Sequence, residues 1–175
     1  MRDPAETTAQ SRTRTVTWQD PMIVASQAGK TSGLEFLQKI VNGELPQPPI
    51  AALLGFRVAK VERGFAMFEF EPAEFHYNPI GVVHGAMAGM LLDSTMGCSV
   101  QTTLPAGVGY TTLEFKVNMV RAVTVKTGPM RAEGRLIHAG SRVATAEGKL
   151  IDAGDKIYAH ATTTCLIFPM SGEPT

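Results

Sequence analysis

The sequence has few of the residues that build disulfides and metal centres. Only two of its 175 residues are cysteines, Cys98 and Cys165, and both lie in apolar runs without another cysteine or a histidine at ligand spacing. The four histidines are not closely paired, and no carboxylate cluster accompanies them. We therefore expect no metal site and two reduced core cysteines, with a disulfide or a catalytic cysteine as the alternative.

The sequence also lacks an excess of charge and a long apolar run. Acidic and basic residues number 16 each, so the overall charge of a nucleic-acid-binding protein is absent. The longest apolar run, residues 79–92, is too short to span a bilayer. The N-terminus has no apolar signal segment, and there is no Gly-rich phosphate loop. We expect a cytoplasmic protein with neither a nucleic-acid nor a membrane partner.

Hydrophobic residues make up 44% of the sequence and charged residues 18%, which is typical of a globular domain. Residues 1–32 are polar and lack a sustained period, which predicts a flexible or loosely docked arm. Within it, residues 13–18 alternate weakly and could form a short strand, and Trp18 is interpreted as a packing anchor. Residues 33–170 form the predicted domain, and residues 171–175 a C-terminal tail.

Two kinds of periodic segment organise the domain. Residues 32–42 predict a helix, because Ser32 stands three residues before Glu35 as in a capping box. Residues 56–61 and 65–70 predict two strands around a turn. The segment 82–100 is apolar on almost every side, which indicates a buried helix.

Four strand-like runs follow the buried helix. Their separators are short and contain glycine, which favours antiparallel hairpins between consecutive runs. The fold class is therefore α+β, with a curved antiparallel sheet wrapped around a long central helix. The runs are residues 110–120, 128–138, 142–152 and 156–168.

The start of the buried helix carries the first candidate site. Pro79 holds Asn78 in an extended or turn conformation, and the helix is expected to begin near His84 and Gly85. The first N–H groups of a helix have no partner within it and carry the positive end of its dipole. Such groups can polarise a carbonyl oxygen that gains charge during acyl transfer. Gly85 has no side chain that would block the approach.

Asp93 is the second candidate, since it is the only acid between Glu74 and Glu114 and lies on the buried helix. Either its charge is satisfied by Ser94, Thr95 or the backbone of the sheet, or it faces a pocket as a base or nucleophile. The eight residues from Gly85 to Asp93 span about 12 Å of helix, whereas both groups must lie about 3 Å from one reacting centre. If both are catalytic, two antiparallel copies must share the site, and the protein is at least a dimer.

The motif Asn78-Pro-x-Gly-x-x-His84-Gly85, followed by Asp93, resembles that of the hot-dog-fold acyl-CoA thioesterases of phenylacetic acid degradation. The resemblance continues through residues 111–118 and 158–163. It implies hydrolysis of an acyl-CoA, including an aromatic, phenylacetyl-CoA-like one, by a homodimer or a homotetramer built as a dimer of dimers. No cofactor is implied, because the CoA thioester is the substrate.

The resemblance also implies residue roles. Gly85 donates its N–H to the thioester carbonyl, and the partner subunit's Asp93 activates water or attacks directly. Asn78 positions the water or the thioester, His84 orients its neighbours at the helix start, and Thr112 assists the acid. Many family members have a second glycine at the position of Ala86, whose methyl group could reshape the acyl pocket slightly but removes no catalytic group.

The remaining histidines receive structural interpretations. His76 is interpreted as a loop residue that could alternatively line the pocket, His160 as a strand residue at the sheet edge, and His138 as a solvated residue beside a turn. Two other functions stay open. A hot-dog hydratase or dehydratase would pair a histidine with an acid on the reacting carbons, and a non-catalytic acyl-CoA-binding protein would show no turnover.

Overall fold

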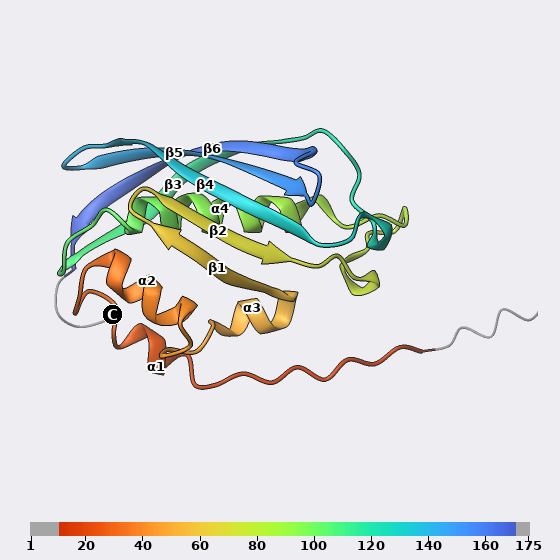
Figure 1. Ribbon diagram of the computed structural model, residues 1–175, viewed down its shortest axis with the longest axis horizontal. Helices are drawn as coiled ribbons and strands as arrows, with labels where there is room; N and C mark the ends of the chain where they lie inside the picture. Colours follow the sequence, from red (N-terminus) through yellow and green to blue (C-terminus); the bar gives the residue numbers. More distant parts are fainter. Residues whose placement is uncertain (1–10, 171–175) are drawn as a thin grey trace, which may run out of the picture.

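Six strands form one antiparallel sheet, and the long helix α4 (Gly85–Gln101) lies against one of its faces (Figure 1). The computed structural model describes residues 11–170. The strand order is β1-β2-β4-β5-β6-β3, so β1 and β3 are the two edges. The strands are β1 (Phe56–Glu62), β2 (Phe65–Phe70), β3 (Val108–Met119), β4 (Met130–Ala139), β5 (Val143–Asp152) and β6 (Ile157–Pro169).

The shorter helices lie on the helix side of the sheet (Figure 1). The predicted helix at residues 32–42 is confirmed as α2 (Gly33–Val41), whose N-cap Ser32 accepts a 3.3 Å hydrogen bond from the N–H of Glu35. α2 packs against β1 and α4. The other short elements are α1 (Met22–Ala25), α3 (Pro49–Leu54) and the 3-10 turns η1 (Glu74–His76) and η2 (Val125–Thr127).

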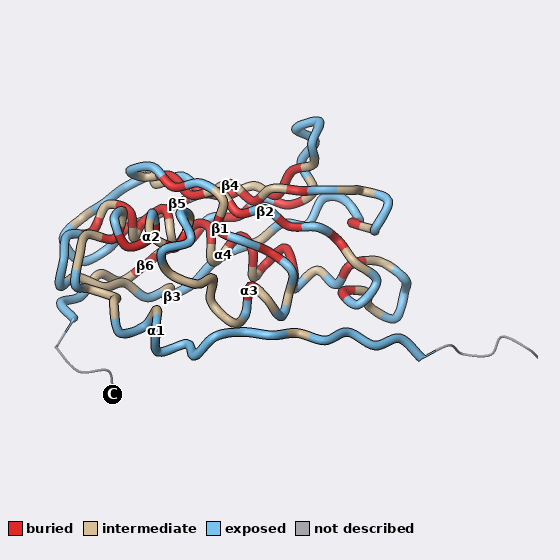
Figure 2. Tube along the Cα trace, turned by 60° about the horizontal axis from the view of Figure 1, so that its bottom comes forward, coloured by how far each residue is buried: buried red, intermediate tan, exposed pale blue. Residues whose placement is uncertain are grey.

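α4 is buried because apolar side chains occupy most of its circumference, as the sequence predicted. Leu91, Leu92 and Met96 are fully buried against the sheet, and Figure 2 shows the buried part of the chain concentrated where α4 meets the strands. Gly134 of β4 allows the close approach, since a side chain there would collide with the carbonyl group of Thr95. The sheet and the helix therefore form one core.

The expectation of hairpins between consecutive strands is confirmed for β1–β2, β4–β5 and β5–β6 but is wrong for β3 and β4. β3 pairs with β6 along its whole length, and β4 pairs with β2. The link at residues 120–129 contains η2 and Pro129 and is longer than a tight turn. The N–H groups of Val120 and Arg121 donate to the carbonyl of Tyr158, which fixes the end of β3 beside β6.

The described part of the arm, residues 11–32, forms no strand, so the short strand considered for residues 13–18 is absent there. Trp18 is 62% exposed and does not act as the expected packing anchor within one chain. Arg14 ties the arm to the domain: its guanidinium donates to the carbonyls of Ala52 and Leu53 and lies 4.0 Å from the ring centroid of Phe75. Residues 1–10 and the tail predicted at 171–175 lie outside the described residues.

Both cysteines are free thiols, as expected. Burial, together with the smaller effect of the nearby Asp93 charge, raises the pKa of Cys98 to about 12, so this thiol stays protonated at neutral pH. Among residues 11–170, no group of histidine, cysteine and acidic side chains is arranged to hold a metal ion. No helix within the same residues has the length and hydropathy needed to cross a membrane.

Candidate active site

One side of α4 carries small residues at four-residue intervals and is covered by the edge strand β3. Gly85, Gly89 and Gly97 share this side with Asp93, which occupies the third position of the series. Because glycine has no side chain, residues of β3 can lie directly against the helix backbone at three of the four positions. The residues of β3 over the three glycines are, in the same order, Met119, Phe115 and Tyr110.

The remaining position, the third of the series, holds a polar pair. Thr112 of β3 lies over Asp93 and donates a 2.9 Å hydrogen bond from Oγ1 to Asp93 Oδ1. A register shift between Thr112 and Glu114 marks a β-bulge, which allows both Thr112 and Phe115 to face α4 although they are three residues apart. The local irregularity of β3 is therefore what aims Thr112 at the carboxylate.

Asp93 is only partly buried. The hydroxyls proposed to satisfy it have other acceptors, since Ser94 Oγ donates to Met90 Sδ and Thr95 Oγ1 donates to the carbonyl of Leu91. Among the described residues, the bond from Thr112 is the only hydrogen bond that Asp93 accepts, and it uses only Oδ1. The geometry therefore leaves Oδ2 available to water or a substrate, which favours the chemical interpretation over the structural one.

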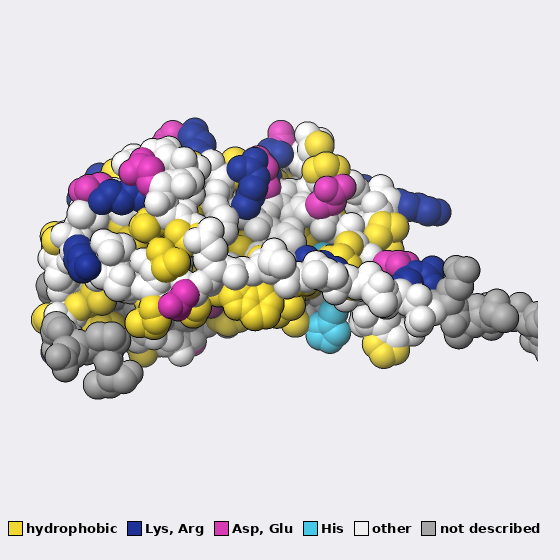
Figure 3. Space-filling view, turned by 90° about the horizontal axis from the view of Figure 1, so that it is seen from below, with side chains coloured by type: hydrophobic (Ala, Val, Ile, Leu, Met, Phe, Trp, Pro, Cys, Tyr) yellow, Lys and Arg dark blue, Asp and Glu magenta, His cyan; other side chains and the backbone are white. Residues whose placement is uncertain are grey.

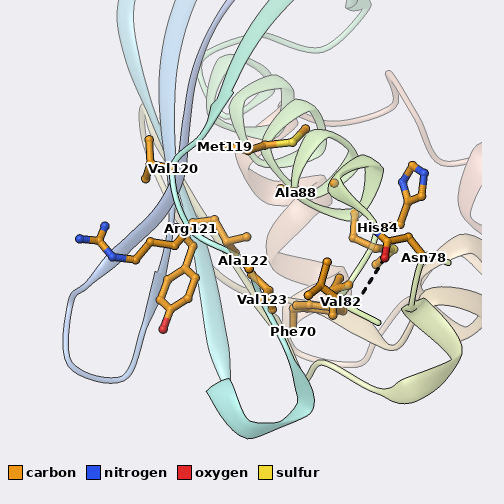
Figure 4. A pocket seen from close by; sticks show the side chains of 15 residues that line it. Phe70, Asn78, Val82, His84, Ala88, Met119, Val120, Arg121, Ala122 and Val123 are labelled. Carbon is orange, nitrogen blue, oxygen red and sulfur yellow. Dashed lines mark hydrogen bonds between the residues drawn. The ribbon is translucent and has the colours of Figure 1, made fainter. Parts of the chain in front are cut away.

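The Thr112–Asp93 pair is one centre of the candidate site. The start of α4 forms the second, around a cavity of about 330 Å³. Asn78 and His84 line it on one side and Val120 and Arg121 on the other (Figure 4), and Gly85, next to His84 in the chain, is also part of the lining. Most of the remaining lining is apolar, so the cavity suits an apolar group next to a polar end. These apolar residues are Phe70, Val82, Val83, Met87, Ala88, Met119, Ala122, Val123 and Leu150.

Hydrogen bonds fix the loop before α4. Asn78 Oδ1 accepts from the N–H groups of Ile80 and Val82 at 3.1 and 3.3 Å, and the backbone N–H of Asn78 donates to the carbonyl of Val82. Gly81 has a φ of 79°, a conformation that glycine adopts without strain. The Asn78 side chain thus holds the loop through its oxygen, and its amide nitrogen remains a donor at the cavity.

His84 is the N-cap of α4, which matches the orienting role that the resemblance implies. Its Nδ1 accepts a 3.0 Å hydrogen bond from the N–H of Ala86, and its carbonyl accepts one from Met87. The N–H of Gly85 has no acceptor within the helix, because the first turn lacks preceding carbonyls. It lies at the positive end of the dipole and at the cavity wall, where it can stabilise a carbonyl oxygen that becomes negative.

One chain does not bring the two centres together. Asn78, His84 and Gly85 meet at the cavity, whereas Asp93 and Thr112 are not part of its lining. Gly85 and Asp93 lie on the same side of α4 but about 12 Å apart along its axis. The five predicted residues therefore form two half-sites along one side of α4, with Asn78 contributed by the loop before the helix and Thr112 by β3.

His76 lies in the connection between β2 and α4, in the turn η1, which agrees with its interpretation as a loop residue, but its side chain is only 5% exposed and is not part of the cavity lining. Nδ1 accepts from the N–H of Ala73, so Nε2 carries the proton and donates to the carbonyl of Leu54 at 2.9 Å. Burial lowers the pKa of the ring, and the charge of Arg14 acts in the same direction, whereas the bond to Leu54 opposes them. The backbone carbonyl of His76 accepts a hydrogen bond from the N–H of His84, so the buried His76 is linked directly to the start of α4.

The other two histidines lie away from both half-sites. His160 is exposed on β6, which has β5 on one side and β3 on the other, so its expected place at the sheet edge is wrong. His138 is exposed near the end of β4, as predicted. No local sequence signal shows that His76 is buried, because its ring packs against Phe70 and bonds to Leu54 of α3, which lies 22 residues away in the sequence.

Comparisons with known proteins identify the family. Residues 80–159 match the thioesterase superfamily. A candidate thioesterase from Ralstonia eutropha JMP134, a phenylacetic acid degradation-related protein, is 30% identical, with a TM-score of 0.67 over 74% of this chain and 98% of that chain. The chain belongs to the thioesterase superfamily. The hot-dog fold predicted from the sequence is thereby confirmed, with α4 as its central helix.

Two further relatives of this thioesterase-superfamily chain are more distant. The candidate esterase SSO1253 of Saccharolobus solfataricus is 26% identical over 77% of this chain and 88% of that protein. The structure of smu.793 from Streptococcus mutans UA159, bound to acetyl CoA, is 22% identical and has a TM-score of 0.59 over 66% of this chain and 90% of that chain. The second likeness concerns the fold alone.

Proposed function

We propose that this thioesterase-superfamily protein hydrolyses acyl-CoA thioesters to a free acid and CoA, in sites shared by two subunits. The observation that carries the proposal is the hydrogen-bonded pair of Thr112 and Asp93 on the same side of α4 as the cavity-lining Gly85. An acid with a free oxygen and a helix N-terminus are the two groups that acyl transfer to water requires.

In the proposed reaction, the N–H of Gly85 donates to the thioester oxygen, and the partner subunit's Asp93 takes a proton from an attacking water. A bond forms between the water oxygen and the carbonyl carbon, and negative charge moves to the carbonyl oxygen. When the C–S bond breaks, the sulfur of CoA leaves with the electron pair and receives the proton that Asp93 holds. Thr112 keeps the carboxylate oriented, and Asn78 donates to the water or the thioester.

The order of residues along α4 and β3 supports a shared site. Gly89 is midway between Gly85 and Asp93 in the sequence, and Phe115 of β3 lies over it. Phe115 is in turn flanked along β3 by Met119 and Thr112, the residues over Gly85 and Asp93. An axis near Gly89 and Phe115 would therefore bring Gly85 of each copy towards the other copy's Asp93.

The edge strand β3 has the surface that such a dimer needs. β3 is an edge of the sheet, with no strand of residues 11–170 on its outer side, and Leu113 and Phe115 are 58% and 41% exposed although both are large and apolar. Hydrophobic side chains also remain exposed on the molecular face seen from below (Figure 3). A second copy could extend the sheet by antiparallel pairing along β3. The homotetramer of two such dimers stays a prediction from the resemblance.

The lining of the cavity supports a proposal for the acyl group. Its wall is mainly aliphatic with Phe70 at one side, a lining that suits an aromatic acyl group. The relative from Ralstonia eutropha JMP134 is related by name to phenylacetic acid degradation. We therefore include a phenylacetyl-CoA-like thioester among the proposed substrates.

The test is a panel of straight-chain, branched and aromatic acyl-CoAs, assayed for free CoA with a thiol reagent. We expect catalytic release of CoA from at least one class, in a stoichiometry of one acid per CoA. Tight binding of acyl-CoA without turnover would show a binding protein. Hydration of an enoyl-CoA with the thioester intact would show a hydratase, and either result would contradict the proposal.

A further inference from the structure

Met119, the last residue of β3, lies directly over the backbone of Gly85. A β-carbon placed on Gly85 would lie 2.5 Å from Met119 Sδ and 3.0 Å from its Cε. The thioether therefore occupies the space that any larger residue at position 85 would need. Figure 4 shows the side chain reaching from β3 towards α4 at the cavity.

The side chain faces the cavity although it is not enclosed by its own chain. Met119 pairs with the buried Ala159 of β6, which places it on the α4 side of the sheet. It lines the cavity together with Gly85 and is 53% exposed. A large apolar side chain that is half exposed at a cavity wall has room to move.

We infer that Met119 is a specificity-determining residue, which limits the width of the acyl group next to the thioester carbonyl and moves aside to admit it. The inference rests on the proposed function, because it assumes that the Gly85 N–H receives the carbonyl oxygen. With the oxygen at Gly85, the carbonyl carbon and the first acyl carbons lie beside the thioether. Residue 119 should therefore discriminate between acyl groups by their width next to the carbonyl rather than by their chain length.

The chemistry of methionine fits this role. Its side chain is unbranched and has three rotatable bonds, so it adapts to differently shaped neighbours. A β-branched residue is stiff at its first torsion and cannot move aside in the same way. The two-fold arrangement adds a second reason, because it brings Met119 towards the partner subunit's Thr112. The side chain would then lie between the two half-sites, next to the carbon that is attacked.

The experiment compares Met119→Ala and Met119→Ile with the wild type on matched acyl-CoA pairs: butyryl against isobutyryl, and phenylacetyl against benzoyl. The second member of each pair is wider next to the carbonyl. Met119→Ala should raise the ratio of kcat/KM for the wide over the narrow member by about tenfold, since a few methylene contacts are worth that much. Met119→Ile should lower the same ratio.

Met67→Ala is the matched control. Met67 lies on β2 and pairs with Lys60 and Glu133 rather than lining the cavity, so its truncation should leave the ratios unchanged. If Met119→Ala does not fold, Met119→Leu tests the same point, because leucine keeps the size but is branched and should lower the ratio. Equal ratios in all folded variants would overturn the inference while the proposed function stands. Failure of the wild type to release CoA from any substrate would overturn both.

Discussion

Thr112 Oγ1 donates a 2.9 Å hydrogen bond to Asp93 Oδ1 across the contact between β3 and α4. The bond orients the carboxylate without neutralising it, because a hydroxyl group contributes no charge. The β-bulge on β3 aims Thr112 at the carboxylate, and the bond uses only Oδ1, so the proposed role of Asp93 as a base can use Oδ2.

Asp93→Asn keeps the shape of the side chain and removes its charge. We expect turnover of acyl-CoA to fall by a factor on the order of 100 or more, because general-base catalysis is lost. The KM and the melting temperature should change much less. Steady-state kinetics on the folded variant measure the effect. Wild-type turnover with lowered stability would instead show that Asp93 is a structural anchor.

Leu113→Arg tests the shared site. Leu113 is at the bulge of the free edge of β3 and is 58% exposed, so the arginine should weaken dimer formation and leave the single chain folded. Turnover per subunit should then fall on dilution and recover at high concentration. Ile137→Arg is the control, since Ile137 is equally exposed, at 58%, near the end of β4. A fully active monomer in sedimentation experiments would contradict the shared site.

Gly85→Ala should lower turnover, because the new methyl group meets the thioether of Met119 and crowds the N–H that receives the carbonyl oxygen. The obstacle is the end of a flexible side chain, so Gly85→Ala combined with Met119→Ala should recover part of the lost activity. Kinetics of the two single variants and the double variant measure this coupling. Additive losses would show that the two residues do not act on each other.

His76 should make the free energy of unfolding depend on pH in the acidic range. Its folded-state pKa is lowered by burial, so below about pH 6.5 the unfolded chain binds a proton that the folded ring resists. The stability that it contributes is present above this pH and is lost as the pH falls through the folded-state pKa. Urea unfolding of the wild type should show this loss.

The comparison variants for this measurement are His76→Gln and His138→Gln. The first should weaken the acid dependence, because it removes the titrating ring. The second should retain the dependence, since His138 is exposed at the end of β4. An unchanged acid dependence in His76→Gln would show that another group is responsible.

The sequence by itself determined the central helix and indicated which residues lie at its two half-sites. The apolar circumference of residues 85–101 requires burial wherever the strands lie, and Pro79, His84 and Gly85 define the loop and the helix start by local backbone rules. Asp93 stood out because an acid on a buried apolar helix is energetically costly unless its charge is paired or used. The catalytic roles of these residues stay predictions, but their placement at one cavity and one polar pair agrees with the motif.

Only the tertiary structure decided which strand covers that helix face. Alternating side chains show that a segment is extended, but they do not name its neighbour, so β3 was expected beside β4 and lies beside β6. That choice puts Met119 over Gly85 and Thr112 over Asp93, and similar distant contacts bury His76. The physical reason is that strand pairing depends on how both faces and both edges of the whole sheet are satisfied, which no short stretch of sequence contains.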